Sequence, residues 1–184
     1  MTHDYQVEKR NKVRQLREKA RYDAETVHAI LDAAVVGHVA FVEDGAAVVV
    51  PMIYGRENET VYLHGARKSR VIRLLEQNAS VCLNVTIVDA LVLARSSFNS
   101  SMNYRSATIF GKPRLIEDPD EKLHAMGVIS EHSMPGRWDE LRAPLDNEMK
   151  MTGVIAIDID TASAKISDTP YPEDEEHDYA TPVW

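Results

Sequence analysis

The sequence predicts a mostly β protein with flanking helices, in which an antiparallel sheet closes into a small barrel. Two observations favour this class. The pair Asp44-Gly45 stands between two apolar runs and is the strongest two-residue hairpin signal in the chain. Short apolar runs alternate with three helical patterns, and no glycine-rich dinucleotide-binding motif accompanies them. An open α+β sandwich is the alternative that this pattern leaves.

Composition restricts the class of protein further. The chain has 184 residues, 44% hydrophobic and 27% charged, which is typical of one globular domain. A formal net charge of -8 argues against nucleic acid as a partner, because phosphate backbones require a broad basic surface. No apolar run is long enough to span a bilayer, and the first residues are too polar for a signal peptide, so we expect a cytoplasmic protein without a membrane partner. Cys82 is the single cysteine, which excludes an internal disulfide.

Charge divides the chain into three parts. Residues 1–22 form a basic N-terminal arm, expected to be solvated or to pack as a helix on an acidic surface. Residues 23–169 form the domain itself. Residues 170–184 are acidic and contain prolines, so this tail should run extended over a surface rather than fold alone.

The first elements follow the arm. Asp23 is a suitable N-cap for a helix that stops before Gly37. Strands are expected at 39–42 and 47–54, joined by the Asp44-Gly45 turn. Because Pro51 cannot donate to a ladder, the second of these strands should carry a bulge or lie at an edge there, which leaves backbone groups for a ligand or for a covering loop.

Later elements continue the same pattern. A polar loop is expected at 55–59, and a further helix begins at Asp118, with Pro119 in its first turn and Glu121 completing a capping box. Residues 137–151 carry no clean period and are not assigned. Asp89 interrupts one strand, and Gly111 marks a bend in another. The further expected strands are 61–63, 80–88, 91–94, 103–116, 154–159 and 163–166.

The segment 60–79 changes period in its middle, from a buried strand to a helix that begins near Arg70. The turn between them contains Arg67, Lys68 and Ser69, so together with Arg70 three cations lie beside a helix N-terminus that is itself partly positive. A phosphate could accept hydrogen bonds from the helix amides, from the Ser69 hydroxyl and from the cations together. The alternative is a solvated basic turn in which Ser69 only caps the helix.

Two strands are apolar on both faces, at 48–53 and 81–88. One chain of this length covers both faces of such strands poorly. A homodimer is therefore expected.

Eight blocks of sequence resemble a known family in order and along nearly the whole chain after the arm. They are VGHVAFVEDG, VVVPMIYG, VYLHGARKSR, VCLNVTIVDALVLARSSFNSSMNYRS, FGKPRLI, EHSMPGRW, TPVW and the Tyr22-Asp23 pair before the first helix. Together they are similar to the pyridoxamine 5'-phosphate oxidase-related flavoproteins, and most closely to the branch of nitroimidazole-resistance proteins. The resemblance implies a six-stranded antiparallel split β-barrel that is an obligate dimer, with FMN bound in two clefts at the dimer interface.

The resemblance also implies which residues bind the cofactor. The phosphate is expected at Lys68, Ser69 and Arg70. The flavin ring is expected along Pro51, Met52, Ile53, Tyr54, His64, Gly65 and Ala66. The cleft is expected to be lined by Met102, Asn103, Tyr104, Arg105 and Ser106, from the same or the other subunit, and Trp184 in the terminal block completes the set.

His64 is the candidate catalytic residue, because an imidazole exchanges protons near neutral pH and the resemblance places it against the ring. The alternative is a histidine that bonds a strand carbonyl. Tyr104 and Arg105 could stack on or bond the flavin, and Arg105 could equally pair with an acid. His38, His124 and His132 lack ligand spacing, so no metal site is expected.

Three functions are compatible with this sequence. The first is an FMN-dependent reductase of a small oxidised molecule, nitroaromatic or otherwise. The second is a flavin-binding protein without turnover, for storage or sensing. The third is a haem-binding protein with His64 near the iron. Oxidation of vitamin B6 is not expected, because the basic strand motif that holds its phosphate in the true oxidases is replaced by the apolar VVVPMIYG.

Overall fold

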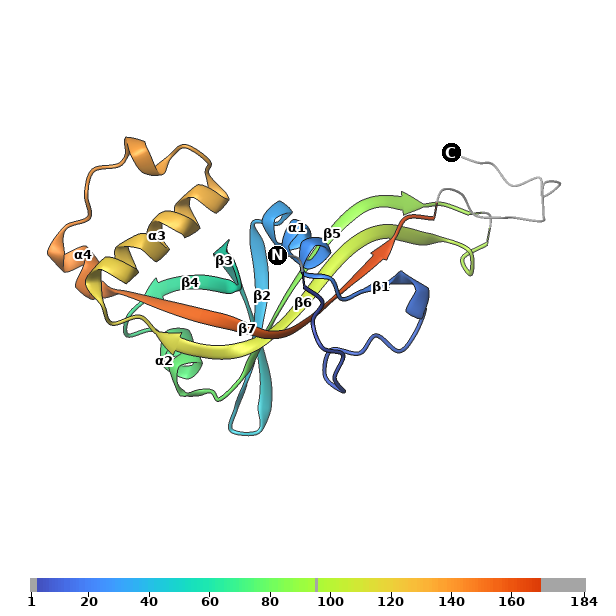
Figure 1. Cartoon of the computed structure of the whole chain (residues 1–184), viewed down its shortest axis with the longest axis horizontal. Helices are drawn as coiled ribbons and strands as arrows, with labels where there is room; N and C mark the ends of the chain where they lie inside the picture. The colour runs from blue at the N-terminus through green and yellow to red at the C-terminus, as the bar shows by residue number, and fades with distance from the viewer. Residues whose placement is uncertain (1–2, 95, 170–184) are drawn as a thin grey trace.

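The computed structural model describes residues 3–94 and 96–169, and its centre is one antiparallel sheet (Figure 1). The described strands follow the order β1-β7-β4-β3-β2-β5-β6, and a further pairing of β6 with β7 closes the barrel. The mostly β barrel with flanking helices is thus confirmed. The strands are β1 (Ala20–Arg21), β2 (Val36–Glu43), β3 (Ala46–Glu57), β4 (Thr60–Ala66), β5 (Val81–Val92), β6 (Ser101–Leu115) and β7 (Thr152–Ser167).

The described strand count is seven, not the expected six. Six strands form the closed ring, and β1 is added to β7 outside it, where Ala20 and Arg21 pair with Lys165 and Ala164. These two residues belong to the basic arm, whose polar sequence shows no strand pattern. The extra strand therefore arises from tertiary pairing rather than from a local signal.

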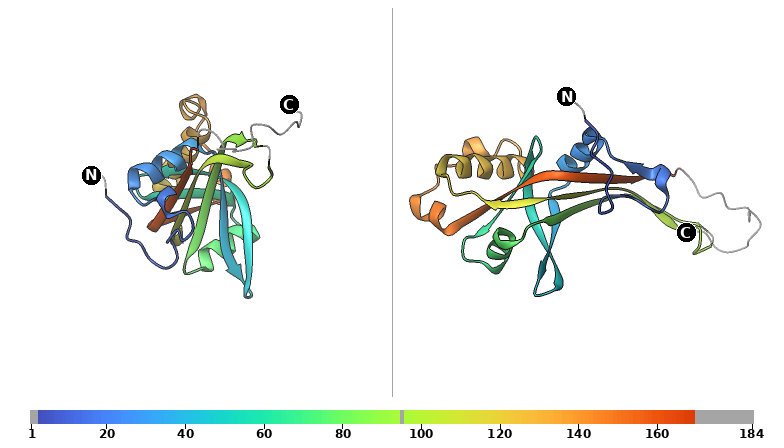
Figure 2. Two further views of the ribbon diagram at one scale, coloured as in Figure 1. Left: turned by 90° about the vertical axis from the view of Figure 1, so that its right-hand side faces the viewer. Right: turned by 60° about the horizontal axis from the view of Figure 1, so that its bottom comes forward.

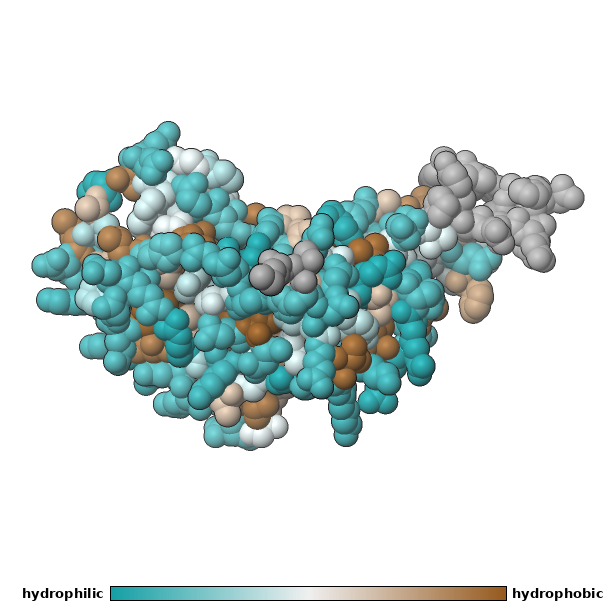
Figure 3. All heavy atoms as spheres, in the orientation of Figure 1, coloured by the Kyte–Doolittle hydropathy of each residue, from teal (hydrophilic) through white to brown (hydrophobic). Residues whose placement is uncertain are grey.

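The helices lie outside the sheet and flank the barrel, as the two views of Figure 2 show. α3 and α4 lie together at one end, and the face drawn in Figure 3 is mostly hydrophilic, with apolar atoms in small groups. Among the described residues, no helix has both the length and the apolar character needed to cross a membrane. The helices are α1 (Ala24–Ala33), α2 (Arg70–Gln77), α3 (Pro119–Ser133) and α4 (Asp146–Met151), with 3-10 turns η1 (Arg17–Lys19) and η2 (Trp138–Glu140).

The N-caps predicted at Asp23 and Asp118 are confirmed, and Ser69 caps α2, the role named as its alternative to phosphate binding. The capping box expected of Glu121 does not form, because its carboxylate accepts from Arg114 at 2.6 Å instead. Asp23, Ser69 and Asp118 each accept a hydrogen bond from the backbone N–H three residues further on, at 2.8, 3.3 and 2.8 Å. Each bond satisfies one of the free amides at the start of a helix. The starts of α1, α2 and α3 are thereby set locally by the sequence.

The predicted hairpin and the strand edge at Pro51 are also confirmed. Asp44 and Gly45 have φ angles of 50° and 80°, as a tight hairpin turn requires, and join β2 to β3. Among the described strands, β2 alone pairs with residues 46–53 of β3, while β4 joins the other side from Tyr54 onward. Pro51 therefore lies on a stretch whose second edge is unpaired.

Three expected strand ends are wrong. Residues 55–57 pair with β4 and continue β3 instead of starting a loop. β5 runs through Asp89, and β7 is one strand where two, 154–159 and 163–166, were expected. Asp89 and Asp160 are the extra residues where the registers of β5–β6 and β6–β7 shift. A bulge lets a polar residue stay in a strand without breaking the pairing on either side.

The core has two parts, on opposite faces of β4. Val61 and Leu63 point into the barrel, with the side chains of β2, β5, β6 and β7 and of helices α1 and α2. Tyr62 points the other way, into a smaller cluster with Ile129 of α3 and Val154 of β7. Because side chains alternate along a strand, His64 lies on the same face as Tyr62, toward α3.

Residues 3–22 lie against the barrel. Tyr5 is buried with 5% of its surface exposed, and the Asn11 side chain donates a hydrogen bond of 2.9 Å to the carbonyl of Ala162 in β7. Lys19 reaches Ser167 at 2.9 Å. The acidic tail and Trp184 lie outside the described residues.

Candidate functional site

The predicted phosphate turn joins β4 to α2. Ser69 closes the turn through its N–H, which donates to the Ala66 carbonyl at 2.8 Å, and its hydroxyl caps α2. Ile72 in the first turn of α2 is fully buried against Gly65 and Gly153, which pair across β4 and β7. The N-terminus of α2 is therefore held close to the end of β4.

The cations of this turn differ in their partners. Arg70 makes a bidentate ion pair with Glu43, with its Nε 3.1 Å from Oε1, and Arg67 pairs with Glu76 at 3.2 Å. The hydrogen bond with Glu43 raises the pKa of Arg70 and that with Arg70 lowers the pKa of Glu43. Lys68 is exposed and makes no ion pair or hydrogen bond with another described residue. Of the three predicted cations, Lys68 is thus the one that no described acidic residue compensates.

His64 lies two residues before the end of β4 and opposite Val154 of β7. Its ring is open to solvent and has no hydrogen-bond partner among the described residues, so no strand carbonyl of that part accepts from it. Part of the ring nevertheless packs against protein, and this desolvation lowers the pKa of His64 because it disfavours the imidazolium. Its neutral form is favoured at physiological pH.

The residues expected along the flavin ring alternate in direction. Pro51 and Ile53 are exposed, whereas the side chain of Met52 packs on the core. Tyr54 is fully buried, donates its hydroxyl hydrogen to the carbonyl of Leu31, and has its pKa raised by burial. Tyr54 can thus contribute only backbone groups to a cofactor.

His64 and Ile53 border a small hollow whose opposite wall is α3 and the η2 turn, with Trp138. Its volume is about 220 Å³ and its lining is mainly apolar. Sequence reasoning missed this hollow because residues 137–151 carry no clean period. The EHSMPGRW block, which contains Trp138, was the one signal for it.

The predicted cofactor segment at residues 102–106 lies far, within one chain, from the predicted cofactor residues around His64. His64 is opposite Val154 on β7, whereas Ser106 is opposite Lys165, eleven residues further along. At about 3.3 Å per residue this is about 35 Å of strand. The structure therefore does not bring the two segments together in one chain.

Within the segment 102–106, Arg105 forms a bidentate ion pair with Asp89 of its own chain, at 2.8 and 3.0 Å. Asn103 donates through its amide nitrogen to the Thr169 carbonyl at 2.8 Å. The amide oxygen of Asn103 is buried and has no hydrogen-bond partner in residues 3–94 and 96–169. A donor from outside these residues would satisfy it.

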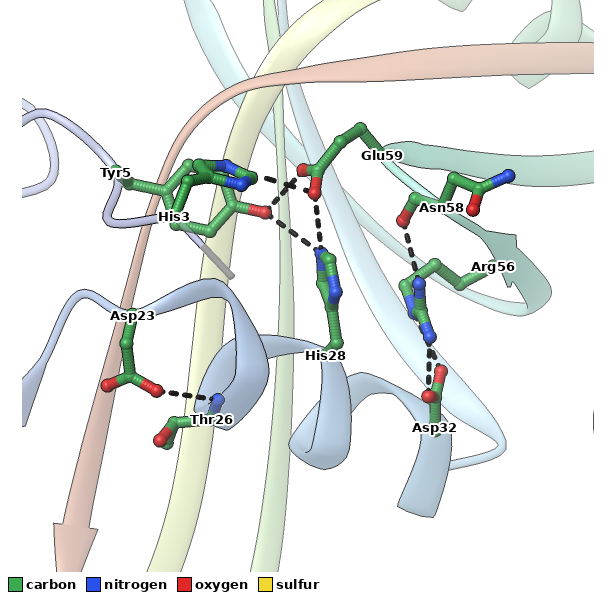
Figure 4. Close-up of polar contacts among 9 residues, drawn as sticks. All are labelled: His3, Tyr5, Asp23, Thr26, His28, Asp32, Arg56, Asn58 and Glu59. Atoms are coloured by element: carbon green, nitrogen blue, oxygen red, sulfur yellow. Dashed lines mark hydrogen bonds and ion pairs between the residues drawn. The ribbon is translucent and has the colours of Figure 1, made fainter. Parts of the chain in front are cut away.

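A polar cluster that the sequence did not predict ties the arm to the barrel (Figure 4). The Tyr5 hydroxyl donates to Glu59 at 2.6 Å and lies 3.0 Å from Nε2 of His28, which in turn is 3.1 Å from Glu59. Burial, with the bond to Glu59, raises the pKa of Tyr5. Beside it, Arg56 of β3 pairs with Asp32 of α1 at 2.7 Å. The only signal in the sequence was an aromatic residue in a largely polar arm.

Metal binding has no geometric support in residues 3–94 and 96–169, where no group of three or more histidine, cysteine or acidic side chains could hold an ion. The burial around Cys82 raises the pKa of its thiol. This burial favours the unreactive protonated form.

Comparison with solved structures finds close relatives. The flavocytochrome Anf3 from Azotobacter vinelandii is 38% identical with a TM-score of 0.84, over 96% of this chain and 82% of that chain. The FAD and heme binding protein from Mycobacterium smegmatis is 36% identical with a TM-score of 0.81, over 90% of this chain and 81% of that one.

A 5-nitroimidazole antibiotic resistance protein from Bacteroides thetaiotaomicron VPI-5482 is 29% identical with a TM-score of 0.70, over 80% of this chain and 86% of that one. No curated protein matches the sequence. The family model described as pyridoxamine 5'-phosphate oxidase matches residues 23–166, most of the barrel. The resemblance in the sequence is confirmed, and the chain belongs to the pyridoxamine 5'-phosphate oxidase family.

Proposed function

We propose that this protein is a flavin-dependent oxidoreductase that holds the flavin phosphate at the turn between β4 and α2. The observation that carries the proposal is Lys68, a cation with no partner among the described residues, beside the capped N-terminus of α2. An anion at this position would accept hydrogen bonds from the free helix amides and from the charged side chain of Lys68 together. The bound flavin supplies the capacity to accept and release electrons.

The flavin ring is proposed to lie along β3, where residues 46–53 have one unpaired edge. The free N–H and C=O groups of an edge strand can bond the polar rim of a flat ligand. Pro51 has no N–H, so it leaves one place on this edge without a donor. His64 is free to hold or release a proton at its ring nitrogens because no described residue bonds them.

FMN and FAD share the phosphate and the ring that these groups are proposed to bind. FMN follows from the resemblance in the sequence, and the Mycobacterium smegmatis relative at 36% identity is described as binding FAD. We propose FMN as the cofactor. Mass spectrometry of the cofactor released from the purified protein distinguishes the two.

A homodimer is proposed because the two cofactor segments lie at opposite ends of one chain. A second copy could bring its residues 102–106 to the His64 end and a donor to the buried oxygen of Asn103. Large apolar side chains exposed on β2, β3 and β5 would be covered in such an assembly. These are Val36, Val42, Val49, Ile53, Val88 and Leu91.

The phosphate proposal is tested with one substitution and two flavins. Lys68→Ala should weaken FMN binding about tenfold or more, because it removes a charge-assisted hydrogen bond. Riboflavin, which lacks the phosphate, should bind as before. Lys112→Ala, which removes a charge from an exposed position on β6, is the matched control and should change neither affinity. Equal losses for both flavins with Lys68→Ala would mean that the phosphate lies elsewhere.

Enzyme and storage protein differ in their response to a reductant. If the protein is an oxidoreductase, NADH or NADPH should bleach the flavin absorbance, and an oxidised acceptor should restore it over many cycles. A flavin that neither NADH nor NADPH reduces, and that dithionite reduces once without any turnover, would favour storage.

Haem binding is a second candidate function. It is favoured by His64, whose neutral, unbonded imidazole is the form that ligates iron, and by two relatives described as a flavocytochrome and as an FAD and heme binding protein. The visible spectrum decides: a Soret band that His64→Ala abolishes would support it. A haem-loaded protein whose band survives that substitution would exclude His64 as ligand.

A further inference from the structure

The hollow between β4 and α3, here called the α3 hollow, has the composition of a small-molecule site. His64 and two serines of α3, Ser130 and Ser133, lie among side chains that are otherwise apolar. Its apolar walls are Ile53, Met126, Ile129, Met134, Trp138 and Leu141. Predominantly apolar walls with a few polar groups are the usual lining of a site for a small organic ligand.

Ser130 is the polar group that lacks a partner. The residue is 9% exposed, and its hydroxyl oxygen is buried without a hydrogen-bond partner in the described part of the chain. A serine in a helix ordinarily bonds a carbonyl of the preceding turn, as Ser133 does by donating to the Ile129 carbonyl at 2.9 Å. A buried hydroxyl without a partner is costly, and a ligand that bonds it removes the cost.

The volume limits what can enter. At about 220 Å³, the α3 hollow is larger than the apolar cavity of about 150 Å³ that accepts benzene, and smaller than the sites of about 300 to 1,000 Å³ that hold drug-sized ligands. One aromatic ring with a short substituent fits this interval. A compound with two separate rings does not.

We propose that the α3 hollow binds a monocyclic aromatic compound with one hydrogen-bond-accepting oxygen, to which the Ser130 hydroxyl donates. The ring would pack among the apolar walls, with Trp138 at its side. If the flavin lies along β3 as proposed above, this compound is the substrate class of the enzyme, because Ile53 and His64 border both places. Only that last step rests on the proposed function.

The test is a binding measurement that requires no turnover. Two fluorinated probes of matched shape, 4-fluoroacetophenone and 1-ethyl-4-fluorobenzene, are titrated against the purified full chain by fluorine NMR. They differ in the carbonyl oxygen. The ketone should bind about threefold to tenfold more tightly than the hydrocarbon, the range expected for one neutral hydrogen bond.

Two serine variants isolate the hydrogen bond. Ser130→Ala should remove the preference for the ketone and leave binding of the hydrocarbon unchanged. Ser133→Ala is the matched control, because Ser133 lines the same hollow but its hydroxyl is already bonded to the helix. It should keep the preference. The two-ring ketone 4-phenylacetophenone should not displace either probe.

Absence of binding by the folded wild type, a ketone preference that survives Ser130→Ala, or displacement by the two-ring ketone would each overturn the proposal. Flavin content measured on the same samples separates this failure from that of the proposed function. A flavin-loaded protein that ignores both probes contradicts only the α3 hollow. A protein that binds them but has no affinity for flavin contradicts only the flavin function.

Discussion

Replacing Gly153 with alanine should weaken FMN binding, although Gly153 is not a proposed flavin contact, because the substitution displaces α2. Gly153 pairs with Gly65, and Ile72 packs over both. An added Cβ at Gly153 would lie 2.7 Å from Cγ2 of Ile72 and 3.2 Å from the Cα of Arg67, whereas ordinary contact begins at 3.4 Å. Ile72 must therefore move by about 0.7 Å. Because it is fully buried, that movement has to include α2 itself.

The magnitude follows from this geometry. Overpacking of this kind costs about 1–3 kcal/mol, and each kcal/mol lowers the Tm of a chain of this size by about 2–4 °C. A shifted α2 misaligns Lys68 and the helix amides. FMN affinity should fall about tenfold, the loss expected for one charge-assisted hydrogen bond, while riboflavin affinity should fall much less.

Fluorescence titration of both flavins and a thermal melt on the same preparation measure these effects. Gly37→Ala is the control, because its Cβ would meet only the side chain of Leu83, at 3.1 Å. It should lower Tm without changing the ratio of FMN to riboflavin affinity. An unchanged Tm in Gly153→Ala would refute the packing argument. A lower Tm with an unchanged ratio would refute the location of the phosphate.

Two further predictions concern Tyr54 and His64. Tyr54→Phe should lower the free energy of unfolding by about 1–3 kcal/mol, and Tm by several degrees, at unchanged flavin content. The reason is that it leaves the Leu31 carbonyl near the end of α1 without the Tyr54 hydroxyl as donor. An unaltered melt would show that this bond contributes nothing. Since the pKa of His64 is lowered below its ordinary 6.5, the unfolded chain binds this proton more readily than the folded one. Stability should therefore be greatest above pH 6.5 and fall as the pH drops toward the folded pKa, and His64→Gln should flatten this slope in melts recorded against pH. A slope identical in both proteins contradicts the shift.

Local signals in the sequence predicted much of the fold. Asp23, Ser69 and Asp118 mark helix starts because a capping side chain acts on residues three positions away. Asp44-Gly45 marks a hairpin because both residues tolerate positive φ. Strand continuity at Asp89 and Asp160 could not be predicted, since a bulge depends on the partner strand.

The site was predictable in part for the same reason. The cations beside α2 are adjacent in sequence, but Glu43, which binds Arg70, lies on another strand and carries no sign of that pairing. Ser130 has no motif of its own, and its unpaired hydroxyl appears only when α3 packs over β4. The FMN cofactor, the dimer and the role of His64 stay predictions.

The pairing of β7 determines when this chain can finish folding. β7 contacts β1, β4 and β6, so the barrel closes only when residues 152–167 meet strands that begin as early as Ala20. Such distant contacts are slow to form because long loops must close first. During synthesis on the ribosome, the apolar surfaces of the earlier strands stay exposed until β7 has left the ribosome. Refolding should therefore be slow, and nascent chains that stop before β7 should aggregate or recruit chaperones.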